Sequence, residues 1–356
     1  MEENNVKKGK SKKKLERTLL TGFQPTGIIT LGNYLGTVQN CLKYQDSFNS
    51  IFFIADLHSL TVRRDPKELN KASMSFYAQL LACGITPQLK ELETADSKKI
   101  SKTLLFFQSH VPQVSELQWI LNCYAAIGEL ERMTQFKDKS AKHEDNINMG
   151  LLDYPVLMAS DILAYQTDLV PVGVDQKQHL ELTRDLAIRF NHIYGDIFRV
   201  PEPIIAKSGA KIYSLQDPTA KMSKSDPNPN ATISIIDSEQ DIVKKFKRAV
   251  TDSGSEIVMR EDKPGISNLI TIYSCITGKT VEDVEKEFAG SGYGNFKVQV
   301  GEAVAAKFKP IREEVERLLT DETYLETLAK ESAKVARRIA KKTLDNVQKK
   351  VGLVKF

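Results

Sequence analysis

The sequence predicts an α/β fold: a doubly wound, Rossmann-like parallel sheet followed by a smaller helical unit. Three observations predict it. Short apolar runs, typical of strands buried on both faces, recur between Thr18 and Val174. Stretches with helical character lie between these runs, which is the alternation typical of a parallel sheet covered by helices. After about Lys207 the strand signals fade and helical segments predominate.

The first unit is expected over residues 18–206. Its strands are predicted at residues 18–21, 50–57, 103–107 and 169–174. Its helices are predicted at residues 33–44, 66–83, 114–124, 154–165 and 176–190. The second of these helices has the clearest limits, because Asp65 can cap it, Pro66 suits its first position and Gly84 can end it.

The second unit is expected over residues 207–356. Loops rich in Pro, Ser, Asp and Asn come first, and helices are predicted at 238–250 and 302–319. The last stretch, from Glu322 onward, is rich in Ala, Lys, Arg and Glu. We expect it to be part of the same helical unit. Residues 1–17 form a basic, low-complexity extension that is expected to be disordered.

Charge and composition narrow the function classes. The chain has 356 residues, 50 Lys and Arg and 46 Asp and Glu. Residues 1–14 hold six lysines and two glutamates, so the rest of the chain is neutral and a nucleic acid would need a local basic patch. The apolar run at 51–55 is far shorter than the roughly 20 residues that span a bilayer. We expect a cytoplasmic protein with no membrane association.

The first chemical signal is the segment 21–36, between the first strand and the first helix. Gly22, Gly27 and Gly32 allow a ligand to approach the backbone closely. Thr30 and Asn33 lie near a helix N-terminus, where free N–H groups favour phosphate. A purely structural glycine-rich turn is the alternative.

The second signal is Lys221-Met222-Ser223-Lys224-Ser225. Its two lysines are three residues apart in a loop without strong periodicity. Such a loop can fold over a triphosphate and meet the charge that grows on leaving pyrophosphate. A solvated loop is the alternative, and the specific string argues against it.

A third pattern places Tyr154, Met158 and Asp161 at i, i+4 and i+7, on one face of a helix. Asp161 stands among apolar residues, where a carboxylate needs a partner. It could serve a ligand, or a neighbouring backbone group or arginine; the residues alone leave both open.

Together, these motifs resemble the two signatures of class I aminoacyl-tRNA synthetases. Thr30 and Asn33 stand where many members have histidine, which resembles the bacterial-type tryptophan branch. Four further segments resemble that branch: 128–137, 154–163, 170–179 and 264–269. The resemblance runs from about Thr18 to the C-terminus. The lysine-rich N-terminus and residues 90–102 depart from it.

The resemblance implies that tryptophan is activated with ATP and transferred to tRNA(Trp). Asp161 would select the indole N–H, with Tyr154 and Met158 packed on the rings. Gln176 would receive the amino group, and Gly22 and His58 would complete the tryptophan side, His58 only peripherally.

On the ATP side the resemblance implies a larger set of residues. The catalytic ones would be Gln24, Thr30, Asn33, Lys221 and Lys224. The remaining contacts would be Pro25, Thr26, Gly32, Lys139, Gly173, Val174, Asp175, Ile212, Met222, Ser223 and Ser225. Mg²⁺ would arrive with ATP, without a protein metal cage. Members of the branch are homodimers, so a homodimer is expected.

Three rival functions remain. A tyrosine–tRNA ligase would need groups for a phenol oxygen. A small-molecule adenylyl transferase would not need the helical C-terminal half. A catalytically silent paralogue that binds RNA would not need the two signatures. The basic run 334–342 is either a solvated helix face or part of the tRNA surface.

Overall fold

A parallel sheet forms the centre of the protein. The computed structural model describes residues 17–25, 27–88, 103–142, 147–173, 176–205 and 211–354. In these ranges five parallel strands lie in the order β3-β2-β1-β4-β5. They are β1 (Thr18–Phe23), β2 (Asn49–Ile54), β3 (Leu104–Phe107), β4 (Leu169–Val172) and β5 (Glu202–Ile205). The order reverses direction at β1, and such switch points are where doubly wound sheets bind ligands. The predicted fold class is confirmed.

The strands are buried on both faces, as their apolar runs predict. Leu20 lies opposite Ile51 in the register, and both side chains face one core. Leu19 and Phe52 alternate with them and face the other core. Because successive residues of a strand point to opposite faces, a doubly covered strand needs apolar residues throughout.

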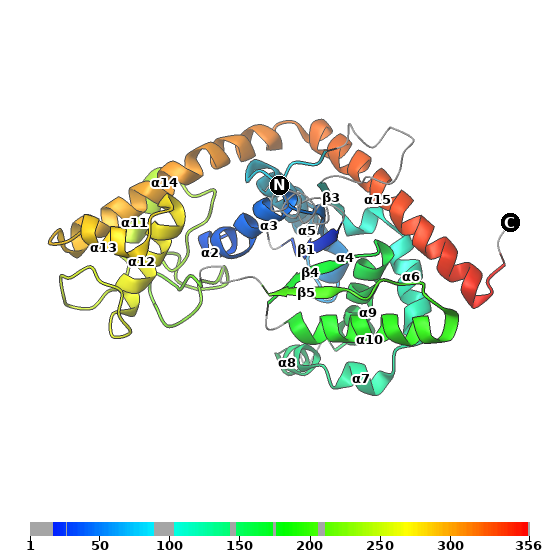
Figure 1. The fold of residues 1–356 in the computed structure, drawn as a ribbon. Coiled ribbons are helices and arrows are strands. Elements are labelled where there is room, and N and C mark those ends of the chain that lie inside the picture. Colours follow the sequence, from blue (N-terminus) through cyan, green and yellow to red (C-terminus); the bar gives the residue numbers. More distant parts are fainter. Residues whose placement is uncertain are drawn as a thin grey trace, which may run out of the picture.

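Helices cover both faces of the sheet. One face carries α2 (Leu31–Asn33), the π-helical turn η1 (Tyr34–Val38), α3 (Gln39–Gln45) and α5 (Pro66–Ala82). The other carries α6 (Gln113–Asn122), α9 (Met149–Ala164) and α10 (Lys177–Tyr194). Figure 1 shows α3 and α5 on the opposite side of the strands from α9 and α10. The short elements α4 (Asp56–Ser59), η2 (Gln108–His110), α7 (Ile127–Glu131) and α8 (Thr134–Lys142) lie between the longer ones.

The limits predicted for α5 are confirmed. The side chain of Asp65 accepts hydrogen bonds from the backbone N–H groups of Lys67 and Glu68, and Pro66 occupies the first helical position. Gly84 follows the helix with a φ of 104°, a conformation that glycine adopts at little cost.

The smaller helical unit consists of α11 (Glu239–Lys247), α12 (Pro264–Thr277), α13 (Val281–Glu287) and most of α14 (Gly292–Leu319). Its apolar core is continuous with the core on the α5 face of the sheet. Tyr34 and Phe308 illustrate the junction, since their rings meet edge to face with centroids 5.2 Å apart. The long helix α14 therefore connects the two units, as Figure 1 shows.

The last helix, α15 (Glu322–Val351), packs elsewhere than the sequence suggested. We expected residues 207–356 to form one helical unit, but α15 returns to the first unit and contacts β3, α6 and α9 (Figure 1). Ser332 marks the contact, because its hydroxyl accepts a hydrogen bond of 2.9 Å from the backbone N–H of Leu105 in β3. The periodicity of a helix shows that one face is buried, but not against which partner.

Smaller differences concern the ends of elements. α9 begins at Met149 rather than Tyr154, because Asn148 caps it, and Pro155 lies inside the helix. α14 begins at Gly292, ten residues before the predicted start at Glu302, despite glycines in its first turns. The sequence prediction contained no strand corresponding to β5. This strand includes Pro203, and the structure places it at the edge of the sheet, where proline is tolerated.

Some expectations lie outside the described residues. These include the disordered extension, apart from Arg17, and the departure at 90–102. Thr26, Val174 and Asp175 also fall there. Among the helices that are described, none is long and apolar enough to cross a membrane.

Candidate active site

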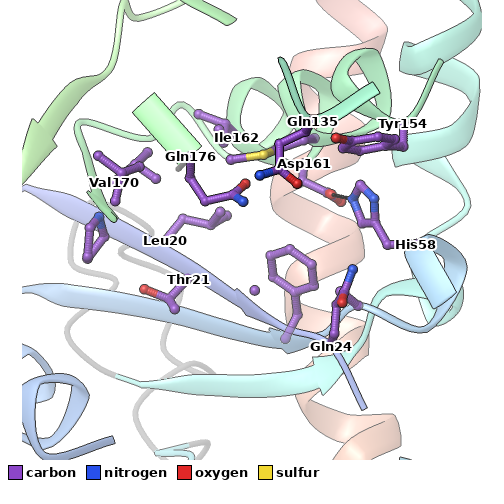
Figure 2. A pocket seen from close by; sticks show the side chains of 16 residues that line it. Leu20, Thr21, Gln24, His58, Gln135, Tyr154, Asp161, Ile162, Val170 and Gln176 are labelled. Carbon is purple, nitrogen blue, oxygen red and sulfur yellow. Dashed lines mark hydrogen bonds and ion pairs between the residues drawn. The ribbon is translucent and has the colours of Figure 1, made fainter. Parts of the chain in front are cut away.

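A cavity of about 370 Å³ opens at the carboxyl ends of β1, β2 and β4. α9 forms one wall, and single residues come from α4, α8 and the start of α10. Figure 2 shows polar side chains from separate elements around this space. Five of the labelled residues were predicted from the sequence as site residues: Gln24, His58, Tyr154, Asp161 and Gln176. The cavity lies at the switch point of the sheet, where the strand order reverses.

The helix face predicted from spacing lines the cavity: Tyr154, Met158 and Asp161 all contribute to its wall. Gly22 contributes from β1, opposite Phe53 in the register. A Cβ atom on Gly22 would lie 2.5 Å from the ring of Phe53, which also lines the cavity. Glycine at this position therefore leaves room for an aromatic wall.

Asp161 is the most deeply buried polar group of the cavity, with 2% of its surface exposed. Its Oδ2 lies 3.0 Å from Nε2 of His58. Nε2 of Gln108 donates to both carboxylate oxygens, at 2.8 Å to Oδ1 and 2.9 Å to Oδ2. Neither partner is the arginine considered as an alternative. His58 is thus a direct partner of Asp161, closer to the site than the sequence suggested.

Opposing effects act on the pKa of Asp161. Burial raises it above the ordinary value for aspartate, because the charged form loses hydration. The hydrogen bonds and charge of His58, and the hydrogen bond of Gln108, lower it. The nearby Asp56 raises it slightly. His58 and Gln108 therefore favour the charged form of Asp161 against the effect of burial.

Tyr154 is held by a histidine on the neighbouring helix. Its hydroxyl lies 2.8 Å from Nε2 of His179, which is completely buried. Burial raises the pKa of Tyr154 to about 12, so the phenol stays neutral. Its ring also meets that of His58 edge to face, with centroids 6.2 Å apart. The tyrosine therefore presents a fixed, uncharged ring to the cavity.

The first glycine-rich signal forms the start of α2. Thr30 caps this helix: its Oγ1 accepts from the backbone N–H of Asn33 and donates to Oδ1 of Asn33 at 2.8 Å. The loop before it is fixed by the buried Gln79, which accepts from the N–H of Ile29 and donates to the carbonyl of Gly27. Gly27 has a φ of 91°, which favours glycine.

The second signal lies directly over the first. A Cβ on Gly32 would lie 3.6 Å from Cβ of Met222 and 3.7 Å from Cβ of Ile212. A Cβ on Gly27 would lie 3.4 Å from Nζ of Lys224. Burial and the charge of Arg64 lower the pKa of Lys224. The structure thus brings together two signatures that are far apart in the sequence.

Lys221 begins the second signal in a short hairpin. Tyr213 and Lys221 form an antiparallel bridge, and the N–H of Met222 donates to the carbonyl of Ile212 at 3.0 Å. Asn268 in α12 holds this hairpin with its whole amide: Oδ1 accepts from the N–H of Tyr213 and Nδ2 donates to its carbonyl, both at 3.0 Å. Asn268 belongs to the segment 264–269, whose role the sequence did not reveal.

The remaining candidates are scattered. Ser223 and Ser225 are exposed, with their hydroxyl oxygens 3.0 Å apart. The backbone N–H of Gln176 donates to the carbonyl of Gly173 at 3.1 Å. Pro25 follows Gln24 at the end of β1. Lys139 lies in α8, but its side chain is outside the described part, as are Thr26, Val174 and Asp175.

Gln108 is the residue that sequence analysis missed. It follows β3 directly and is 1% exposed. The signal that could have revealed it is its position, because the carboxyl ends of parallel strands meet at one edge of the sheet.

Comparison with known proteins agrees with this geometry. The profile of the family described as tRNA synthetases class I (W and Y) matches residues 12–309. A curated tryptophan–tRNA ligase from Clostridium tetani is 49% identical over 339 residues, which cover 95% of this chain and 96% of that protein.

Solved structures agree as well. Tryptophanyl-tRNA synthetase from Mycoplasma pneumoniae superposes with a TM-score of 0.80 at 35% identity, covering 96% of this chain and 99% of that one. The Campylobacter jejuni enzyme complexed with ADP and tryptophan gives 0.79 at 34% identity, covering 94% and 100%. The chain belongs to the family of class I tRNA synthetases for tryptophan and tyrosine.

Proposed function

We propose that the chain acts as a tryptophan–tRNA ligase through the cavity around Asp161. It is an aminoacyl-tRNA synthetase that forms tryptophanyl-adenylate from ATP and transfers tryptophan to tRNA(Trp). The observation that best supports this activity is the extent of the match to a curated tryptophan–tRNA ligase. Tryptophan, ATP and tRNA(Trp) are its partners.

The cavity supports the choice of amino acid. Asp161 accepts the indole N–H, while Tyr154 and Met158 contact the rings. Gln176 receives the amino group, and Gly22 and His58 complete the wall. Rejection of an analogue without the N–H follows from the unpaired carboxylate that would remain.

The nucleotide binds where the two signatures meet. Thr30, Gly32 and Asn33 receive phosphate at the start of α2, and residues 221–225 cover it. Gln24 and Pro25 lie between both substrates. Thr26, Lys139, Gly173, Val174, Asp175 and Ile212 are proposed as further contacts to ATP.

Two steps complete the reaction. A carboxylate oxygen of tryptophan attacks the α-phosphorus of ATP, and the bond to pyrophosphate breaks. A hydroxyl of the tRNA 3′-terminal ribose then attacks the activated carbonyl, and AMP leaves. Lys221 and Lys224 stabilise the charge that develops on pyrophosphate, so positioning and electrostatics supply the catalysis.

Mg²⁺ enters as part of the ATP substrate. Lys221 and Lys224 at the nucleotide site suit phosphate oxygens and not a cation. Within the described residues, no group of three His, Cys, Asp or Glu side chains is arranged to hold a metal ion. We propose that phosphate oxygens and water supply most of the Mg²⁺ ligands, as is usual for Mg²⁺ bound with ATP.

The two steps can be measured separately. Amino-acid-dependent exchange of labelled pyrophosphate into ATP, tested with all twenty amino acids, should occur with tryptophan alone. Exchange with tyrosine would overturn the pocket assignment, and no exchange would favour the silent paralogue. Charging of a tRNA(Trp) transcript separates the ligase from a small-molecule adenylyl transferase.

The exposed basic residues of α15 offer a tRNA contact. Lys334 and Lys341 form ion pairs with Glu331 and Asp345 on the same helix, as a solvated face would. Arg338 and Lys342 are exposed on the same helix. The double change Arg338→Glu and Lys342→Glu should weaken tRNA charging while pyrophosphate exchange is retained.

We also propose a homodimer that acts in the cytoplasm. Leu60, Trp119 and Met149 are large apolar residues with 63%, 72% and 73% of their surface exposed. The first turns of α9 connect them, since Asn148 bonds to the carbonyl of Thr61 and Asp153 accepts from Gln118. Such a patch suits an isologous interface. Trp119→Glu should give monomers in sedimentation velocity, while Val354→Glu should not.

A further inference from the structure

Gln108 donates hydrogen bonds to the Asp161 carboxylate but does not line the cavity. It lies at the first position of η2, directly after β3, and its side chain is almost fully buried. Its Nε2 donates to both oxygens of the carboxylate, so this nitrogen lies between Oδ1 and Oδ2. A contact of this kind restricts rotation of the carboxylate about its last bond.

The second donor comes from another element. His58 in α4 approaches Oδ2 from its Nε2 at 3.0 Å. Each carboxylate oxygen can accept about two hydrogen bonds. Gln108 and His58 together occupy one position on Oδ1 and two on Oδ2, so Oδ1 keeps capacity for a further donor.

Hydrogen bonds also connect the two elements that carry Gln108 and His58. Asp56, the first residue of α4, accepts from the backbone N–H of Ser109 at 2.9 Å and from its hydroxyl at 2.5 Å. Ser109 follows Gln108 in η2. The turn that carries Gln108 is therefore tied to the helix that carries His58.

We propose that Gln108 is a positioning residue for amino-acid selection, which fixes the plane of the Asp161 carboxylate so that Oδ1 meets the indole N–H. The proposal rests on the role of Asp161 proposed above. Gln108 acts on tryptophan only through Asp161, because it lies outside the cavity wall.

The orientation of the amide agrees with this role. In the described part of the chain, Oε1 of Gln108 is buried and has no hydrogen-bond partner. A flipped amide would place this oxygen against the carboxylate. The negative charge of Asp161 therefore keeps the amide nitrogen of Gln108 toward the carboxylate. Each side chain restricts the orientation of the other.

Charges around Asp161 give the pair a measurable pH dependence. The groups that face it are His58 and Asp56 from α4, Gln108 from η2 and Tyr165 at the end of α9. Gln108 is among the donors that lower the pKa of Asp161 against the effect of burial. Removing Gln108 raises that pKa, so the carboxylate becomes protonated at a higher pH.

The test compares Gln108→Met and Gln108→Glu with the wild type in pyrophosphate exchange. Gln108→Met should raise KM for tryptophan about 10- to 100-fold, the range for a lost hydrogen bond to a buried charge. KM for ATP should change less than about threefold, because the nucleotide site is separate. The rise of tryptophan KM on acidification should begin at a higher pH. Gln108→Glu should have the larger effect, since two carboxyl groups then meet.

The matched control is Gln299→Met. Gln299 in α14 also donates to a carboxylate, that of Glu302 at 3.2 Å, but away from the cavity. It should leave tryptophan KM and its pH profile unchanged. Circular dichroism and KM for ATP identify a variant that has merely lost its fold.

Discrimination against the benzothiophene analogue of tryptophan, in which sulfur replaces the N–H, separates two kinds of failure. If the wild type discriminates and Gln108→Met keeps the wild-type preference, tryptophan KM and pH profile, the role of Gln108 is wrong. If the wild type itself does not discriminate, the proposed role of Asp161 fails first. A preference reduced at least about tenfold in Gln108→Met, which equals about 1.4 kcal/mol, supports the proposal.

Discussion

The Asp161 carboxylate lies among apolar side chains and accepts hydrogen bonds from two partners. Breaking a buried, paired charge by removing one partner costs roughly 3–5 kcal/mol. This cost makes the residue a selective acceptor: a ligand with a donor at the right place is stabilised, and one without it leaves the carboxylate poorly satisfied. The same physics explains why His58 and Gln108 belong to the site.

Protonation should remove this selectivity. Because burial raises the pKa of Asp161, its charge is lost at a higher pH than for an exposed aspartate as the pH falls. The folded pKa is above the unfolded one, so ionisation at rising pH also costs stability. We expect KM for tryptophan to rise on acidification while KM for ATP stays nearly constant. Pyrophosphate exchange measured from neutral to mildly acidic pH checks this, and parallel changes in both constants would contradict it.

At the scale of elements, the small unit supports the nucleotide loop through α12. Its second residue, Gly265, packs so closely that an added Cβ would lie 2.3 Å from the carbonyl oxygen of Val250. The N–H of Val250 in turn donates to the carbonyl of Leu215, which lies within the hairpin between Tyr213 and Lys221. The helix, the loop and the hairpin therefore form one packed assembly.

Gly265→Ala should test this assembly. Because the clash involves backbone and not a flexible side chain, we expect a loss of roughly 1–3 kcal/mol in the free energy of unfolding. Gly294→Ala in α14 is the matched control: nothing lies within 4 Å of its added Cβ, and alanine favours the helix. Urea denaturation measures both. Equal stabilities for the two variants would show that the close contact does not matter.

At the scale of the molecule, α15 joins the end of the chain to the sheet. Its buried face covers the same core as α6 and α9, and Ser332 satisfies a backbone N–H of the edge strand β3. An edge strand has unpaired backbone groups on one side, which need partners when they are buried. The C-terminal helix therefore stabilises β3, the strand that precedes Gln108.

Ser332→Ala should leave the N–H of Leu105 buried and unpaired. The expected cost is roughly 1–3 kcal/mol in the free energy of unfolding. Thr327→Ala, on the exposed face of α15, should change stability by less than about 0.5 kcal/mol. Both values come from urea denaturation, and a neutral Ser332→Ala would mean that the bond contributes little.

The sequence predicted the parts of the molecule that follow from local patterns. Apolar runs located four strands, and helical spacing placed Tyr154, Met158 and Asp161 on one wall of the cavity. Contacts between distant segments were not predictable in this way. Gln108 carries no local motif, and α15 shows a buried face without naming its partner. Both depend on which elements meet in space.

The most direct test of the account compares tryptophan with its benzothiophene analogue in pyrophosphate exchange by the wild-type protein. The two amino acids have similar shapes, and only tryptophan can donate a hydrogen bond from its ring. If Asp161 selects the indole N–H, kcat/KM should favour tryptophan by about 10⁴-fold, the range for a site built around a buried hydrogen bond. A preference within about tenfold, the range of apolar fit alone, would contradict the central role of Asp161.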